Sequence, residues 1–138
     1  MDDGLVTVPS SHTVAATVDR LEAAIIGKGM TVFARIDHAK AAAEAGLTLR
    51  PTELLVFGSP VAGTPLMQQR QMVGIDLPLK ALAWEDRDGR VWLTYNDVAW
   101  IARRHGIEPA GHPELARMAA VVADVTSQAV AGNPTASC

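Results

Sequence analysis

Cysteine is almost absent from the sequence, and aromatic residues are scarce. Cys138 is the single cysteine, so this chain can form no internal disulfide and cannot assemble a metal site from several thiolates. Aromatic residues make up 4% of a chain that is 49% hydrophobic, so alanine and aliphatic side chains must fill most of the core. We expect Cys138 to lie in a frayed terminal tail.

The sequence also lacks a long hydrophobic run and a concentration of basic charge. No stretch approaches the roughly 18 apolar residues that cross a bilayer, and Met1 to Gly4 do not begin a basic region followed by a hydrophobic one. These features predict a cytoplasmic protein without a membrane partner. The 15 acidic and 12 basic residues give a net charge of −3, and the basic ones are scattered, which argues against nucleic acid as a partner.

The remaining pattern is that of one small mixed domain. A chain of 138 residues suits a single core, so we expect one domain over 1–138 with a disordered tail over 132–138. Hydrophobic periodicity predicts strands over 5–8, 31–37, 53–57, 79–86 and 90–95, and helices over about 14–25, 39–45, 64–73, 98–105 and 113–131. The order β-α-β-α-β-α-β-β-α-α favours an α+β two-layer sandwich, with helices packed on a mixed or antiparallel sheet of about five strands.

Two local patterns predict specific contacts. Gly89 lies in a short connection between alternating segments, which favours an antiparallel hairpin of 79–86 with 90–95. In the last helix Leu115, Met118, Val122 and Val125 recur at helical spacing, so this stripe should be buried against the sheet or a partner chain.

Several motifs in the central stretch recur in one protein family. They are Phe33 with Ile36-Asp37-His38, Phe57-Gly58-Ser59-Pro60, Gly63-Thr64-Pro65-Leu66-Met67, Gly74-Ile75-Asp76-Leu77-Pro78-Leu79-Lys80, Trp84-Glu85-Asp86 and Tyr95. Through them the chain resembles, over about 5–105, the domain of unknown function 302 family. The resemblance implies a compact α+β domain with helices on one side of the sheet, and a homodimer, but no established activity. The family usually has Asn where this chain has Ser59, and the final helix lies beyond the motifs.

The best candidate for ligand binding is the segment that leads from the third strand into a helix. It comprises Gly58, Ser59, Pro60, Gly63 and Thr64. Thr64 before Pro65 predicts a helix start, and free N–H groups at such a start favour an anion such as phosphate or carboxylate. The alternative is that glycine and proline only shape a turn while Thr64 caps its own helix.

Candidate catalytic residues are Asp37, His38, Lys80 and Tyr95. An imidazole can act as general acid or base, with Asp37 fixing its tautomer and Lys80 or Tyr95 stabilising developing charge. The alternative is that Asp37-His38 only caps a helix. The other histidines are too dispersed to specify a metal, His105 is better explained as a hydrogen-bonded core residue, and the sequence indicates no cofactor.

Three functions remain open at this stage. The first is a non-catalytic accessory or sensor module that binds a small molecule or an anion, formed as a homodimer. The second is a small enzyme that uses His38 as acid or base. The third is a protein–protein interaction domain that acts through its dimer interface, where Trp84 and Trp92 would be anchors.

The candidate residues share one pocket only under a particular strand arrangement. If the two strands that precede Asp37-His38 and Gly58 run parallel, their carboxyl ends lie together, and His38 and Thr64 would meet there. Antiparallel pairing would separate them.

Overall fold

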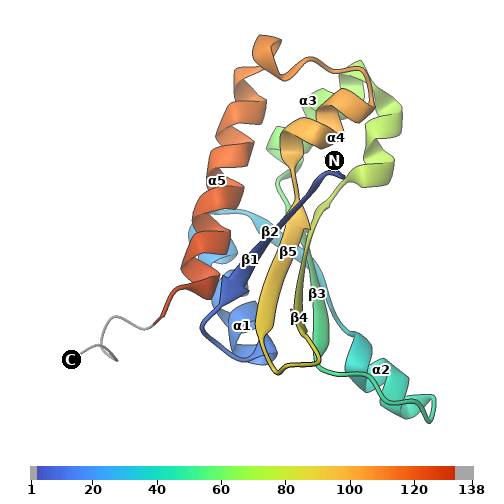
Figure 1. Ribbon diagram of the computed structural model, residues 1–138. Coiled ribbons are helices and arrows are strands. Elements are labelled where there is room, and N and C mark those ends of the chain that lie inside the picture. The colour runs from blue at the N-terminus through green and yellow to red at the C-terminus, as the bar shows by residue number, and fades with distance from the viewer. Residues whose placement is uncertain (1–2, 133–138) are drawn as a thin grey trace.

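A computed structural model describes residues 3–132 of the chain (Figure 1). The elements are β1 (Leu5–Ser10), α1 (Val14–Gly27), β2 (Thr31–Asp37), α2 (His38–Glu44), β3 (Thr52–Gly58), α3 (Pro60–Gln69), the 3-10 helix η1 (Gln71–Asp76), β4 (Leu79–Glu85), β5 (Val91–Asn96), α4 (Val98–Arg104), the short 3-10 helix η2 (Pro109–Gly111) and α5 (Pro113–Val130). The predicted α+β class and the predicted order are confirmed. The expected tail lies mostly outside the described residues, as does Cys138.

The five strands form one sheet in the order β1-β5-β4-β3-β2, and every neighbouring pair is antiparallel. β4 and β5 form the predicted hairpin, in which Trp84 lies opposite Trp92. The register of β2 against β3 shifts between Val32 and Ala34, so Phe33 occupies a bulge at this edge of the sheet.

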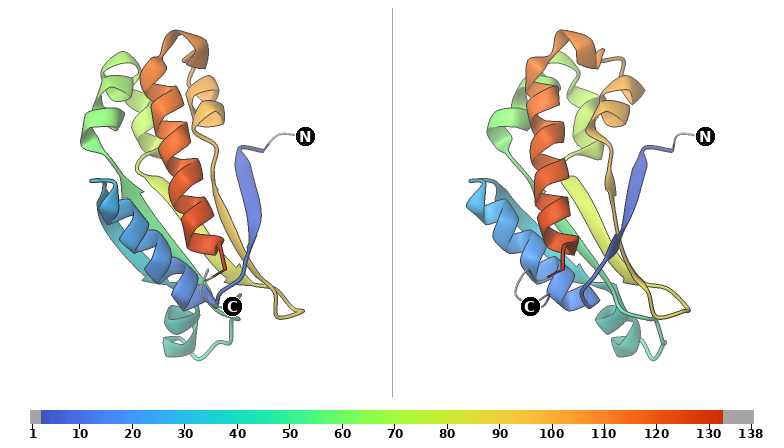
Figure 2. Two further views of the ribbon diagram at one scale, coloured as in Figure 1. Left: turned by 90° about the vertical axis from the view of Figure 1, so that its left-hand side faces the viewer. Right: turned by 60° about the vertical axis from the view of Figure 1, so that its left-hand side comes forward.

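The core lies between the sheet and a layer made by α1 and α5 (Figure 2). The stripe of α1 is fully buried at Val18, Leu21 and Ile25, as its spacing predicts. On α5, Val122 and Val125 are buried and Met118 is partly buried, so the predicted burial of this stripe is confirmed. It packs on α1 and on the sheet within the chain itself.

The opposite face of the sheet is not covered by a helix within residues 3–132 (Figure 2). It carries side chains of the alternate register, which are half-buried: Leu54, Val56, Leu82, Trp84, Trp92 and Thr94. The two tryptophan rings stack with centroids 6.4 Å apart, and the indole N–H of Trp84 donates to Thr94 Oγ1 at 2.9 Å. This uncovered surface of β3, β4 and β5, called the open face below, is mainly apolar, with Lys80 on β4 as a charged residue.

Asp86 organises the turn of the β4–β5 hairpin. Its Oδ1 accepts the backbone N–H groups of Asp88 and Arg90 at 2.9 and 3.0 Å, and its Oδ2 accepts the indole N–H of Trp92 at 2.9 Å. Gly89 takes a φ of 80°, which a residue with a side chain rarely adopts. The bond from Trp92, followed by those from the turn, lowers the pKa of Asp86 below its ordinary value of 3.8.

We expect Asp86 to make the stability of the protein dependent on acid pH. A carboxyl group whose pKa is lowered by folding stabilises the native state above its unfolded pKa, and this contribution is lost as the pH falls through the lower, folded pKa. Urea unfolding of wild type and Asp86→Asn should therefore show a stability difference that is constant at neutral pH and shrinks as the pH falls through 3.8 and below. The control is Asp88→Asn, in the same turn. A difference for Asp86→Asn that does not change with pH would contradict this role.

Candidate functional site

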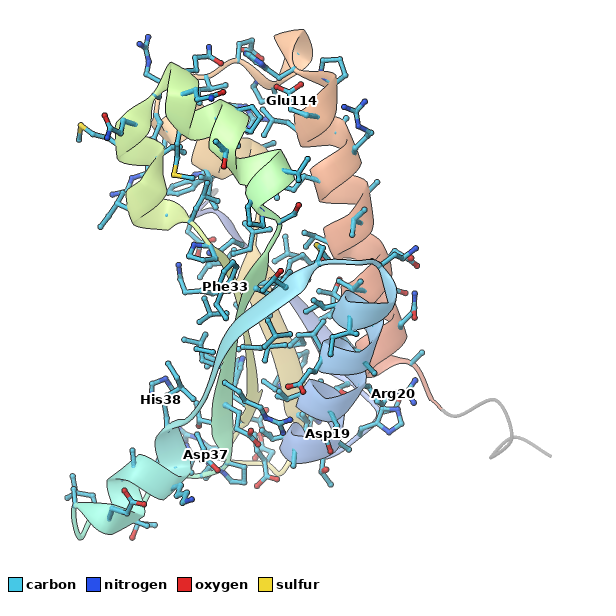
Figure 3. All side chains as sticks on the ribbon, turned by 180° about the vertical axis from the view of Figure 1, so that it is seen from behind. Asp19, Arg20, Phe33, Asp37, His38 and Glu114 are labelled. Atoms are coloured by element: carbon cyan, nitrogen blue, oxygen red, sulfur yellow. The ribbon has the colours of Figure 1, made fainter. Side chains whose placement is uncertain are left out.

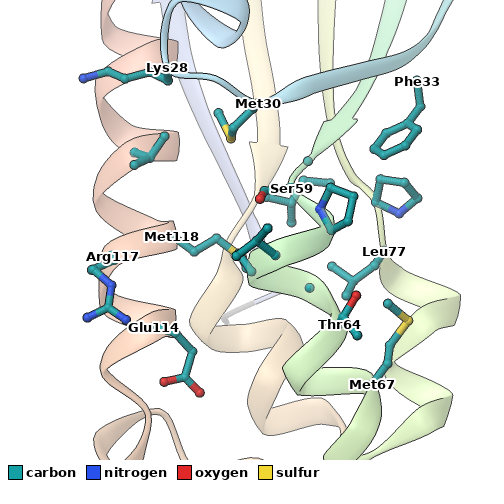
Figure 4. Close-up of a pocket in the computed structure, with 18 residues that line it drawn as sticks. Lys28, Met30, Phe33, Ser59, Thr64, Met67, Leu77, Glu114, Arg117 and Met118 are labelled. Carbon is teal, nitrogen blue, oxygen red and sulfur yellow. The ribbon is translucent and has the colours of Figure 1, made fainter.

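A pocket of about 470 Å³ lies between α3 and α5 (Figure 4). Its volume is in the range of typical small-molecule sites. One wall is α3 with the segment 77–79, and the other is α5 with the connection from α1 to β2. We call it the α3–α5 pocket.

The predicted ligand-binding residues all line this pocket. They are Gly58, Ser59, Pro60, Gly63 and Thr64, and they come from the end of β3 and the first turns of α3. The structure therefore brings the five together beside a cavity that could hold a ligand.

The predicted helix start at Thr64 is wrong. The helix begins one turn earlier, with Ser59 at the N-cap position and Pro60 as the first helical residue, and Pro65 falls inside it. Pro60 meets the same requirement as Pro65, because a proline at the first helical position loses no needed donor. The helix ends at Gln69 and not near Val73, because the chain continues as η1.

This earlier start weakens the prediction of an anion at free N–H groups. The N–H groups of Ala62 and Gly63 already donate to the carbonyl of Ser59 at 3.0 and 2.8 Å, and Pro60 has none. The side chain of Ser59, by contrast, makes no capping bond, and its hydroxyl has no hydrogen-bond partner among residues 3–132.

The interior of the pocket is mainly apolar. Three methionines contribute to it from three different elements: Met30 precedes β2, Met67 is on α3 and Met118 is on α5. Leu77 and Val121 complete opposite walls. Methionine side chains are flexible and polarizable, so such a lining can adapt to ligands of different shape.

The charged groups of the pocket stand at its rim, and most have partners. Lys28 Nζ lies 2.6 Å from Asp124 Oδ2, and Glu114 Oε1 lies 3.1 Å from Nδ1 of His112. A hydrogen bond from its own backbone N–H, aided by His112, lowers the pKa of Glu114, so this group is a carboxylate at neutral pH. In Figure 4 the Lys28 and Arg117 side chains extend along the outer side of α5.

Gly63 leaves room in the wall of the pocket. It is buried within α3, and its φ is not positive, so backbone conformation does not require glycine there. A Cβ at this position would meet Leu77 Cδ1 at 3.6 Å and Met67 Cε at 4.0 Å, which are ordinary contacts.

Asp37 and His38 lie at the other end of the sheet, so the shared pocket that parallel strands would give is excluded (Figure 3). β2 and β3 are antiparallel, with Asp37 opposite Glu53 and Thr31 opposite Gly58. Asp37 Oδ1 accepts the N–H of Lys40 at 2.9 Å and caps α2, while His38 is exposed. Asp37 therefore has the role of a helix cap, which was the alternative to a catalytic role.

The other two catalytic candidates are also separate. Lys80 is on the open face of β4, whereas Tyr95 pairs with Ala81 and lies on the face that α1 and α5 cover. The four candidate residues do not converge on a common point, and no group of three or more His, Cys, Asp or Glu side chains within residues 3–132 is arranged to hold a metal ion.

His105 is a hydrogen-bonded, largely buried residue, as predicted. Its Nε2 lies 2.6 Å from Asp76 Oδ2, and Arg104 Nη1 donates to Asp76 Oδ1 at 2.9 Å. Asp76 ends η1, and Leu77 directly after it lines the pocket. This cluster fastens one pocket wall to α4.

A family model described as "Domain of unknown function DUF302" matches residues 6–125. The chain belongs to the DUF302 family. The match runs beyond the resemblance, which covers about 5–105, and takes in much of α5, including Met118 and Val121 of the pocket. Both walls of the α3–α5 pocket are thus part of the DUF302 domain.

Three Brucella proteins are 50% identical to this DUF302 chain over 129 residues. They are named fluoride-specific ion channel FluC 1 in Brucella suis and in Brucella abortus, and fluoride-specific ion channel FluC 2 in Brucella melitensis. The matches cover 94% of this chain but 51%, 48% and 48% of those proteins. The chain therefore spans about half the length of the curated relatives it matches. None of its helices within residues 3–132 is long and apolar enough to cross a bilayer.

A solved structure with the same fold is the uncharacterized conserved DUF302 protein from Bacillus stearothermophilus. The two superpose with a TM-score of 0.80 over 93% of this chain and 99% of the other, at 19% sequence identity. At this identity the comparison supports the fold alone.

Sequence reasoning found one wall of the pocket and missed the other. The glycine and proline motif indicated residues 58–64, but Met30, Met118 and Val121 are far away in the sequence and carry no local signal of binding. The spacing of the last helix predicts Met118 as part of its buried stripe, and in the structure Met118 is partly buried and also borders the cavity.

We expect Gly63→Ala to stabilise the protein by about 0.5–1 kcal/mol, because alanine is the better helix former and its Cβ meets only ordinary contacts. Urea unfolding measures the change. The control is Gly27→Ala, at the end of α1 with no atom within 4 Å of the added Cβ, which should give a similar or smaller gain. Destabilisation by Gly63→Ala alone would mean that the pocket wall has no room for a methyl group.

Proposed function

We propose that this DUF302 domain binds a small molecule in the α3–α5 pocket and acts as an accessory or sensor module. The observation that carries the proposal is the cavity of about 470 Å³, with an apolar interior and adaptable methionines on both walls. Gly63 supports it, since neither backbone conformation nor packing requires glycine at a position that borders the cavity.

Of the two ligand types that the sequence suggested, the pocket favours a small organic molecule over a free inorganic anion. A free anion needs several unsatisfied donors or cations. Here the N–H groups of Ala62 and Gly63 are used and Lys28 is paired with Asp124. The other cation of the lining, Arg117, is exposed on α5. A small anionic ligand and a cytoplasmic location remain predictions of the sequence.

The geometry supports a catalytic role of His38 less well than a binding role of the pocket. His38 is exposed at the far end of the sheet from the pocket, and the carboxylate of Asp37 is engaged with the N–H of Lys40. A binding role requires none of these groups.

The accessory role is supported by the length of the Brucella relatives. In these proteins, named fluoride-specific ion channels, the matched region makes up about half of the chain. A binding domain joined to a second region could report the presence of its ligand to that region. Fluoride belongs among the anions to be tested.

Methionine-methyl NMR is the most direct test of the proposed function. With ¹³C-methyl methionine, titration with small apolar molecules should shift the signals of Met30, Met67 and Met118, which line the pocket. Met72, which is 80% exposed and does not line it, is the internal control. The shifts should disappear in Gly63→Leu, whose side chain would occupy the cavity.

If a broad set of small molecules and anions, fluoride included, leaves the three methyl signals unchanged, the proposed function is wrong. Equal shifts at Met72 would indicate nonspecific binding and would equally count against the pocket. Circular dichroism of Gly63→Leu confirms that this variant still folds.

A second function, self-association, is favoured by the open face of the sheet. Its apolar surface, built around the stacked Trp84 and Trp92, has no helix over it within residues 3–132. Broad apolar surfaces of this kind are typical of interfaces. We propose that two copies pair through the open face as a homodimer.

Analytical ultracentrifugation of wild type and Leu82→Lys tests the dimer. Leu82 is at the middle of the open face, so a lysine there should leave a folded monomer, because pairing would bury its charge. The matched control is Leu47→Lys, at a 67% exposed leucine after α2, which should remain a dimer. A wild type that sediments as a monomer at high concentration refutes the proposal.

A further inference from the structure

We infer that the α3–α5 pocket selects a neutral, largely apolar molecule with a single polar group, and that Ser59 is the residue that recognises this group. The inference rests on the proposed function, because it assigns a ligand class to the same pocket. It also assigns a role to a hydroxyl that the fold itself does not use.

Ser59 stands in the wall of the pocket among apolar side chains. In Figure 4 it lies between Met30 and Met118, with its hydroxyl oxygen directed toward the α5 side. Serine at an N-cap position usually accepts a backbone N–H of the first helical turn, but Ser59 makes no such bond. With no partner among residues 3–132, the half-buried hydroxyl can both donate to and accept from a ligand.

The surroundings of Ser59 are unsuitable for the charged group of a ligand. In Figure 4, Met30 and Met118 lie on either side of Ser59, and neither offers a counter-charge. Of the ionic groups that line the pocket, Lys28 is paired with Asp124 and Glu114 with His112. The third, Arg117, is exposed on α5. A charged group placed at Ser59 would lose its hydration without a partner, whereas a hydroxyl or carbonyl needs only the one bond.

The cavity sets the size of the apolar part. About 470 Å³ accommodates a small ring system or a medium-length alkyl chain, and the three methionines allow either shape. Affinity should therefore rise with each added methylene, by about fourfold per group. The rise should stop when the cavity is full.

Calorimetric titration with three ligands of equal chain length tests the inference: 1-octanol, octanoate and octylammonium. Octanol should bind most tightly, by roughly tenfold or more over either ion, because burial of an unpaired charge is costly. Ser59→Ala should weaken octanol about three- to tenfold, the effect of one neutral hydrogen bond. Ser127→Ala, which removes an exposed serine hydroxyl on α5 outside the pocket lining, is the matched control and should leave the affinity unchanged.

The outcomes separate the inference from the proposed function. If octanoate or octylammonium binds as tightly as octanol, or if Ser59→Ala binds octanol like wild type, the ligand class is wrong while small-molecule binding in the pocket stands. If 1-butanol, 1-hexanol and 1-octanol bind with equal affinity, the apolar part is not buried and the inference also fails. If none of these ligands binds while other small molecules shift the methionine signals, the inference alone is overturned. If no small molecule shifts them, both fail.

Discussion

The packing of α5 on α1 is the interaction on which the pocket depends. The C-terminal half of α5 is fixed there by buried Val122, Val125 and Ala129, and Arg20 of α1 donates to the carbonyls of Gln128 and Ala129 at 2.8 and 3.2 Å. α1 ends at Gly27, whereas α5 continues past it to Pro113. The N-terminal half of α5 therefore lies opposite α3 and not opposite α1. The α3–α5 pocket is the space between these two helices (Figure 4).

The antiparallel sheet gives the two ends of the molecule different properties. Gly58 leads into α3 at the end where α5 extends beyond α1, so that end has walls on two sides. Asp37 and His38 are at the opposite end, where α2 projects from the sheet with no buried residue (Figure 3). A cavity forms at the Gly58 end because α3, α5 and the connection from α1 to β2 meet there. The Asp37 end has only the exposed cap of α2.

The sequence predicts those features that short-range periodicity controls, and it predicts poorly those that depend on contacts between distant segments. The stripes of α1 and α5 and the alternation of β4 and β5 are local patterns, and each is found as expected. The start of α3 was misplaced because Pro60 and Pro65 are equally good first residues by local criteria, and only the complete structure distinguishes them. The direction of β2 relative to β3 is likewise not encoded in either strand alone. For the same reason, Met30 and Met118 could not be recognised as pocket residues before α5 was placed beside α3.

If the α3–α5 pocket binds a neutral, mainly apolar molecule, a crystal structure of the protein grown with 1-octanol should show the alcohol in it. We expect electron density between Met30, Met118 and Leu77, with the ligand oxygen within hydrogen-bond distance of Ser59 Oγ. An empty pocket, with the alcohol bound only on the open face of the sheet, would exclude the α3–α5 pocket as the binding site. It would then favour a domain whose functional surface is the uncovered side of β3, β4 and β5.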